Sequence, residues 1–153
     1  MIYVLALLLG VVAGLRTMTP PAMIAWAAHL GWLDLAPTAL AFLGNIWSRV
    51  LLTLAALGEL VTDQLPATPS RTVPVQFGAR LVSGGFCGAA IGLAHNGTVA
   101  CTLAGVVGAV IGTLGGRAFR ARLAAAFRRD PPAAFIEDAL AIIGALLIGL
   151  ALR

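Results

Sequence analysis

Six charged side chains stand inside or beside long apolar runs, where a charge is costly unless a partner or a function compensates it. They are Arg16, Glu59, Asp63, Arg80, Glu137 and Asp138. Glu59 and Asp63 are one helical turn apart and therefore share a helix face. Glu137 and Asp138 follow Pro132 by five and six residues, about 8–9 Å into a helix. Being adjacent, they point about 100° apart, so we expect them to have different partners.

The composition places these charges in a membrane protein. Of the 153 residues, 60% are hydrophobic and 10% are charged, whereas a soluble domain has about 25% charged residues. A spanning helix needs roughly 20 mostly apolar residues, and unpaired backbone groups are costly in hydrocarbon. We therefore predict an all-α, polytopic transmembrane helical bundle, with residues 1–153 forming a single integral membrane domain.

Prolines and polar clusters divide the chain into six short, glycine-rich segments. The segments run roughly over residues 2–17, 20–32, 38–62, 75–94, 98–120 and 132–152. We expect Thr19 to cap the second segment. The first two segments either span a locally thin bilayer or form a re-entrant hairpin, and we expect them to span. The fifth should leave the membrane and continue as a basic amphipathic stretch along the interface.

Six alternating spans would bring the arginines to one side of the membrane. That side would hold Arg16, Arg71, Arg80 and the five arginines of residues 117–132, whereas the other would hold Arg153. By the positive-inside rule, we predict that the arginine side is cytoplasmic and that both termini are extracytoplasmic. All ten basic residues are arginine, which is typical of a bacterial gene and indicates the bacterial cytoplasmic (inner) membrane.

The arginine side also collects a candidate binding site. The second, fourth and sixth helices would begin there, so their N-terminal amides and the arginines would suit a phosphate or carboxylate. The candidate substrate-binding residues are Arg16, Thr17, Thr19, Glu59, Asp63, Ser70, Arg71, Arg80, Glu137 and Asp138. In the alternative interpretation, Arg16 and Arg80 pair with the carboxylates and fix helix register. The hydroxyls of residues 68–72 either contact a headgroup or cap the fourth helix.

Three sets of glycines repeat every four residues, so that each set lines one helix face. They are Gly10 and Gly14; Gly84, Gly88 and Gly92; and Gly108, Gly112 and Gly116. We expect these stripes to pack helices within the chain, with homo-oligomer formation through one stripe as the alternative.

The remaining polar residues do not indicate an enzyme. Arg49 falls near the middle of its segment and needs an internal partner, for which His29 and Asp34 are candidates. Cys87 and Cys101 are expected to be packing thiols. The spacing of the histidines and cysteines predicts no metal, and no motif indicates a cofactor or a nucleophile. Arginines beside a membrane helix more often meet anionic lipid headgroups, so we predict membrane lipids and no nucleic acid as partners.

Three motifs resemble a bacterial membrane family, that of domain of unknown function 4126. They are GLRTMTPPA at residues 14–22, GELVTDQLPATPSRT at residues 58–72 and FIEDALAI at residues 135–142. The resemblance covers nearly the whole chain and implies an integral membrane protein without an established reaction.

Convergence of charges and helix starts leads to two functional hypotheses. We favour a small transporter or permease, or a binder, for an anionic solute or lipid headgroup. The alternative is a structural or accessory scaffold whose charges are ion pairs. Three helices per half would permit an inverted repeat, although the acidic pairs take different positions in the two halves.

Overall fold

The computed structural model describes residues 1–63, 73–128 and 130–153, apart from the side chain of Asp130. The described residues form six α-helices and no strand, which confirms the all-α prediction. The helices are α1 (Ile2–Leu15), α2 (Thr19–His29), α3 (Ile46–Thr62), α4 (Pro74–Ala94), α5 (Thr98–Phe127) and α6 (Asp130–Ala151), with a short 3₁₀ helix, η1 (Ala41–Gly44), before α3.

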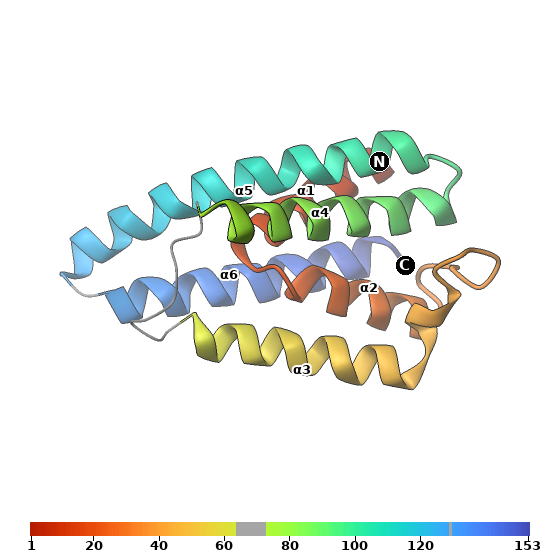
Figure 1. Ribbon diagram of the computed structural model, residues 1–153, viewed down its shortest axis with the longest axis horizontal. Helices are drawn as coiled ribbons and strands as arrows, with labels where there is room; N and C mark the ends of the chain where they lie inside the picture. The colour runs from red at the N-terminus through yellow and green to blue at the C-terminus, as the bar shows by residue number, and fades with distance from the viewer. Residues whose placement is uncertain (64–72, 129) are drawn as a thin grey trace.

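The helices run alternately along the long axis of the molecule (Figure 1). One end holds both termini, the residues that join α2 to α3, and the turn between α4 and α5. The opposite end, which we call the network end, holds the α1–α2 turn, the end of α3 and the start of α4, with the end of α5 and the start of α6 extending beyond them. The charged segments predicted to share one side therefore do lie at one end.

Helices α1, α4 and α5 form the most closely packed part of the bundle. A Cβ atom at Gly10 would overlap the carbonyl of Gly105, and one at Gly108 would overlap the carbonyl of Leu7. Gly88 meets the backbone of Cys101 in the same way. The glycine stripes thus permit backbone contact within the chain, as predicted. Cys87 and Cys101 are free and buried, in agreement with their expected packing role.

Two helix boundaries differ from the prediction. The third segment was expected to begin near residue 38, but α3 begins at Ile46, where the side chain of Asn45 accepts the N–H of Trp47 and caps the helix. Helix α5 continues past residue 120 without a break to Phe127, because no proline or left-handed residue interrupts it before Arg128, whose φ is 53°. The predicted interfacial stretch is therefore the last part of α5.

The later start of α3 also corrects the prediction for Arg49. This residue lies in the first turn of α3, not in the middle of a span. Its guanidinium carbon lies 5.2 Å from the centroid of the Trp26 ring. No ion pair joins Arg49 to His29 or Asp34 among the described residues, and a carboxylate oxygen of Asp34 accepts the N–H of Ala36 instead.

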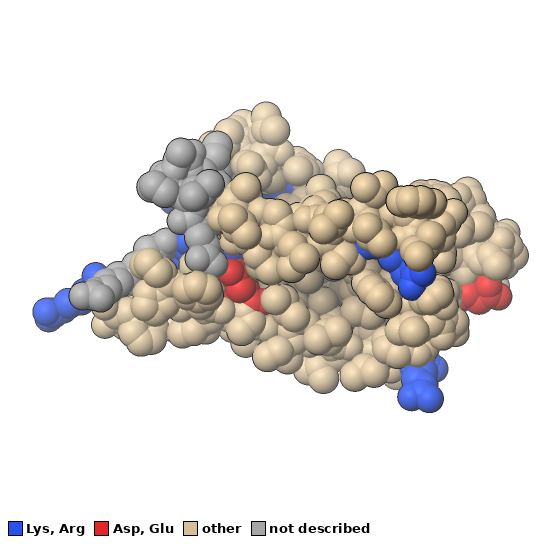
Figure 2. Space-filling model, turned by 90° about the horizontal axis from the view of Figure 1, so that it is seen from below, with Lys and Arg blue, Asp and Glu red and all other residues tan. Residues whose placement is uncertain are grey.

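Three helices are long and apolar enough to cross a membrane: α4, α5 and, within α6, residues Pro131–Ala151. Helix α1 has 14 residues and α2 has 11, so they measure about 21 Å and about 16 Å and are shorter than a hydrocarbon layer of about 30 Å. Uncharged surface covers most of the face shown in Figure 2, and acidic surface is confined to one area left of the centre and one at the right end. By length and composition, the three long helices suit a membrane protein.

Candidate functional site

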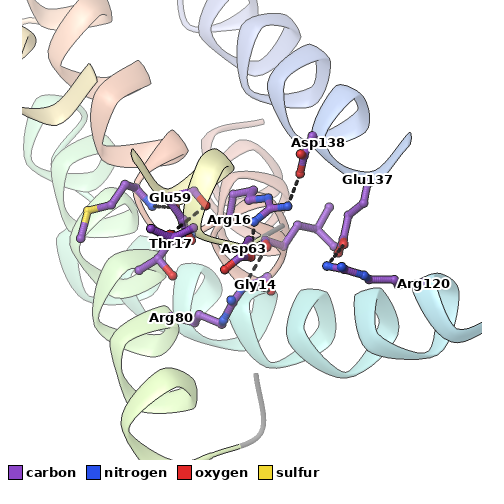
Figure 3. A network of polar contacts seen from close by, with 12 residues as sticks. Gly14, Arg16, Thr17, Glu59, Asp63, Arg80, Arg120, Glu137 and Asp138 are labelled. Atoms are coloured by element: carbon purple, nitrogen blue, oxygen red, sulfur yellow. Dashed lines mark hydrogen bonds and ion pairs between the residues drawn. The ribbon is translucent and has the colours of Figure 1, made fainter. Parts of the chain in front are cut away.

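Arg16 is the centre of a polar network at the network end. Helix α1 ends at Leu15, and Arg16 follows in an extended conformation, with φ −138° and ψ 120°. Its side chain is completely buried, and its two terminal nitrogens donate to Asp63 and Asp138 (Figure 3). One arginine therefore joins the end of α1 to the end of α3 and to α6, as the ion-pair interpretation predicted.

Glu59 binds backbone instead of an arginine. Its two carboxylate oxygens accept the N–H groups of Thr17 and Met18, each at 2.7 Å. These amides lie immediately before α2, where free N–H groups and the helix dipole favour an anion. The helix start that was predicted to suit a phosphate or carboxylate thus holds a carboxylate of the chain itself.

This arrangement corrects the expected role of Thr19. Thr19 is the first residue of α2, the N-cap position belongs to Met18, and no side chain of α2 caps the helix. The carboxylate of Glu59 takes the place of a local cap because it reaches the free amides from another helix. Thr17 contributes its backbone to the network, and Thr19 has no side-chain hydrogen bond there among the described contacts.

Arg80 joins α4 to the end of α1 through hydrogen bonds. The residue is 2% exposed, and one terminal nitrogen donates to the carbonyl oxygens of Gly14 and Leu15, both at 2.8 Å. Carbonyls in the last turn of a helix lack partners within it and attract a cation. Ser83, one turn further along α4, donates its hydroxyl to the carbonyl of Thr17. Ser83 was not among the predicted site residues, although its spacing of three residues from Arg80 places both on one helix face.

Glu137 and Asp138 have different partners, as predicted. Asp138 pairs with Arg16, whereas a carboxylate oxygen of Glu137 lies 3.8 Å from a terminal nitrogen of Arg120 on α5. Glu137 is fully buried, and the Arg120 side chain is 18% exposed. Arg120 had been assigned only to the basic stretch. Ser70 and Arg71, the other two candidate site residues, lie outside the described residues, as do the hydroxyls of residues 68–72.

The described network contains three arginines and four carboxylates. Its anions are therefore already present, and each contacts an arginine or a helix start. An added anion would need one of these carboxylates to leave its position or to take up a proton. Chemically, the arrangement can exchange one anion for another, and it can equally hold the helices together.

The three conspicuous motifs of the sequence all contribute to this network, through Arg16, Glu59 with Asp63, and Glu137 with Asp138. Residues 3–151 match the model of a family described as a domain of unknown function, DUF4126. The chain belongs to this family. No curated protein and no solved structure gave a match. The family match thus covers nearly the whole chain and assigns it no activity.

Proposed function

We propose that this DUF4126 protein is a small membrane transporter or permease that binds an anionic solute or lipid headgroup at the start of α2. The observation that carries the proposal is the pair of 2.7 Å hydrogen bonds from the N–H groups of Thr17 and Met18 to the Glu59 carboxylate. In this proposal, Glu59 occupies the anion site in the empty state. A substrate carboxylate or phosphate replaces it on the same two amides.

The position of Glu59 supports such an exchange. Glu59 is on α3, which has no buried residue and packs mainly against α2 and η1. Little apolar packing would therefore be lost if the end of α3 withdrew, because no residue of α3 is buried. The ion pair of Asp63 with Arg16 would have to break in the same movement. Met18 is 37% exposed and Thr17 is 7% exposed, so the Met18 amide lies nearer the surface of the molecule than the Thr17 amide, and Arg16 is buried.

Arg16 provides the positive charge of the proposed site. Its Nε is buried and has no hydrogen-bond partner among the described residues, while its terminal nitrogens hold Asp63 and Asp138. A short helix whose N-terminus points to an anionic group is also a recurrent device in secondary transporters. Because the described part of the network has four carboxylates and three arginines, the incoming anion displaces Glu59 instead of adding to it.

The experiment compares wild type with Glu59→Gln in detergent, with thermal unfolding measured against phosphates, carboxylates and glycerophosphate headgroups. Ligand binding raises the free energy of unfolding by RT ln(1 + [L]/Kd), and the thermal midpoint rises with it. We expect a saturable shift in wild type and tighter binding, on the order of tenfold, in Glu59→Gln, because a hydrogen bond to a charged group contributes about 1.5–3 kcal/mol.

Glu137→Gln is the matched control for this experiment. It removes a carboxylate of the same network that contacts Arg120 and not the α2 amides, so it should leave anion affinity near the wild-type value. If no anion shifts the midpoint of wild type or Glu59→Gln, the transport proposal is wrong.

The complete burial of Arg16 between two carboxylates favours a second candidate, a scaffold or accessory subunit with structural ion pairs. This candidate predicts that single charge substitutions reduce folded yield without any ligand effect. It also predicts that exchanging the charges of Arg16 and Asp138 restores part of that yield.

A further inference from the structure

A groove lies between α2 and α3, on the far side of the molecule from the network end. It has a volume of about 290 Å³ and is lined by Trp26, Ile46, Arg49, Val50, Thr53 and Leu54. Ile46, Val50 and Leu54 follow one another at four-residue intervals and so form one apolar stripe along α3. All three are substantially exposed, at 57%, 43% and 59%. The groove is therefore mostly apolar and has one cation, Arg49, at its wall.

The cation, Arg49, is held in place without an acidic partner. The Trp26 ring lies against it at 5.2 Å, and Trp26 Nε1 donates to the Thr53 hydroxyl at 3.1 Å, which fixes the ring. The Nε of Arg49 is buried and has no hydrogen-bond partner, and no carboxylate forms an ion pair with Arg49 among the described residues. Cation–π contact with Trp26 is the one charge-stabilising contact of Arg49 among the described residues, and such a contact alone contributes only modestly to stability.

The helix itself gives no reason for a cation at this position. Arg49 is in the first turn of α3, where the helix dipole favours an anion and opposes a cation. An external anion would remove this conflict, because it would pair with the guanidinium and balance its charge. The partner that Arg49 lacks is thus an anionic group beside the apolar groove.

Aromatic residues place this anion at the depth of lipid headgroups. Tyr3 is at the start of α1, Trp47 is at the start of α3 and Trp26 is near the end of α2, so all three belong to the end of the bundle that holds the termini (Figure 1). They are 51%, 70% and 41% exposed. Exposed Trp and Tyr side chains at one level form the belt that marks a membrane–water interface.

We propose that the groove binds a phospholipid with a net negative headgroup. Its phosphate pairs with Arg49 near the start of α3, and one acyl chain lies along Val50 and Leu54, in the direction of the network end. A phospholipid fits better than a soluble anion because the site joins a single cation to an exposed apolar stripe. This lipid site does not depend on the proposed transport function, since it uses none of the residues of the network.

The test is native mass spectrometry of the full chain, with phosphatidylglycerol and phosphatidylcholine added in turn. Wild type should retain phosphatidylglycerol in preference to phosphatidylcholine, and Arg49→Gln should bind phosphatidylglycerol about fivefold more weakly. Arg153→Gln, which removes an exposed arginine near the same end, should behave like wild type. Inorganic phosphate should not displace the lipid.

A second variant guards against poor folding of Arg49→Gln. Val50→Phe narrows the groove and leaves Arg49 in place. It should also weaken retention of phosphatidylglycerol. Equal retention of both lipids by wild type, or undiminished retention of phosphatidylglycerol by Val50→Phe and Arg49→Gln, would overturn the proposal. Displacement by inorganic phosphate would contradict it too, because the site would then be one for a soluble anion.

Discussion

At the scale of single residues, Arg16 has the highest expected cost of removal. Arg16→Gln leaves Asp63 and Asp138 without their common partner in a buried region, and breaking a buried pair in this way costs about 3–5 kcal/mol. We expect a large fall in folded yield and in the thermal midpoint in detergent. Asp138→Asn should cost less, because Arg16 keeps Asp63. An unchanged midpoint for Arg16→Gln would contradict a structural role for this arginine.

The sequence located this cluster but not its individual contacts. Charges close to helix breaks predicted that Arg16, Glu59 and Asp138 would gather at one end, because alternate helix ends share a side. Glu59 was expected to face an arginine or a substrate, yet it binds two backbone amides. Which group a side chain meets depends on the rotation of each helix and on the extended conformation of Arg16, and neither can be obtained from hydrophobic spacing.

At the scale of helices, α5 offers two glycines with opposite surroundings. A Cβ atom at Gly108 would overlap the carbonyl oxygen of Leu7 on α1, whereas one at Gly115 would meet nothing within 4 Å. Gly108→Ala should therefore separate α1 from α5 and lower the thermal midpoint. Gly115→Ala should leave it unchanged or raise it slightly, because alanine favours a helix by about 0.5–1 kcal/mol over glycine. Equal midpoints for the two variants would show that the contact of α1 with α5 contributes little to stability.

The helix boundaries show where apolar patterns mislead. Residues 38–45 are mostly apolar and were assigned to the third helix, but the hydroxyl of Thr38 donates to the carbonyl of Leu35 and accepts the N–H of Leu40. Such local side-chain bonds compete with a helix. Asn45 then caps α3, whose first residue, Ile46, comes eight residues after the expected start near residue 38. The glycine stripes were more informative, since a four-residue repeat fixes a face whatever the helix ends are.

At the scale of the whole molecule, the alternating helices separate two chemically different ends. The network end holds most of the described arginines, namely Arg16, Arg80, Arg117, Arg120, Arg122 and Arg128, and the other end holds Arg49 and Arg153. The exposed aromatic residues Tyr3, Trp26 and Trp47 belong to the latter. A bilayer would accommodate this asymmetry with arginines on its cytoplasmic side.

The resulting prediction is that the terminal end is extracytoplasmic. Alkaline phosphatase fused after Arg153 should be active, and a fluorescent protein at the same place should remain dark, whereas a reporter inserted within residues 64–72 should behave in the opposite way. The expectation holds whether α1 and α2 span the membrane or form a re-entrant hairpin, because both arrangements return the chain to the side on which it began. An inactive phosphatase and a bright fluorescent protein after Arg153 would place the arginines of the network end on the extracytoplasmic side. The proposed anion site would then lie at that face of the membrane.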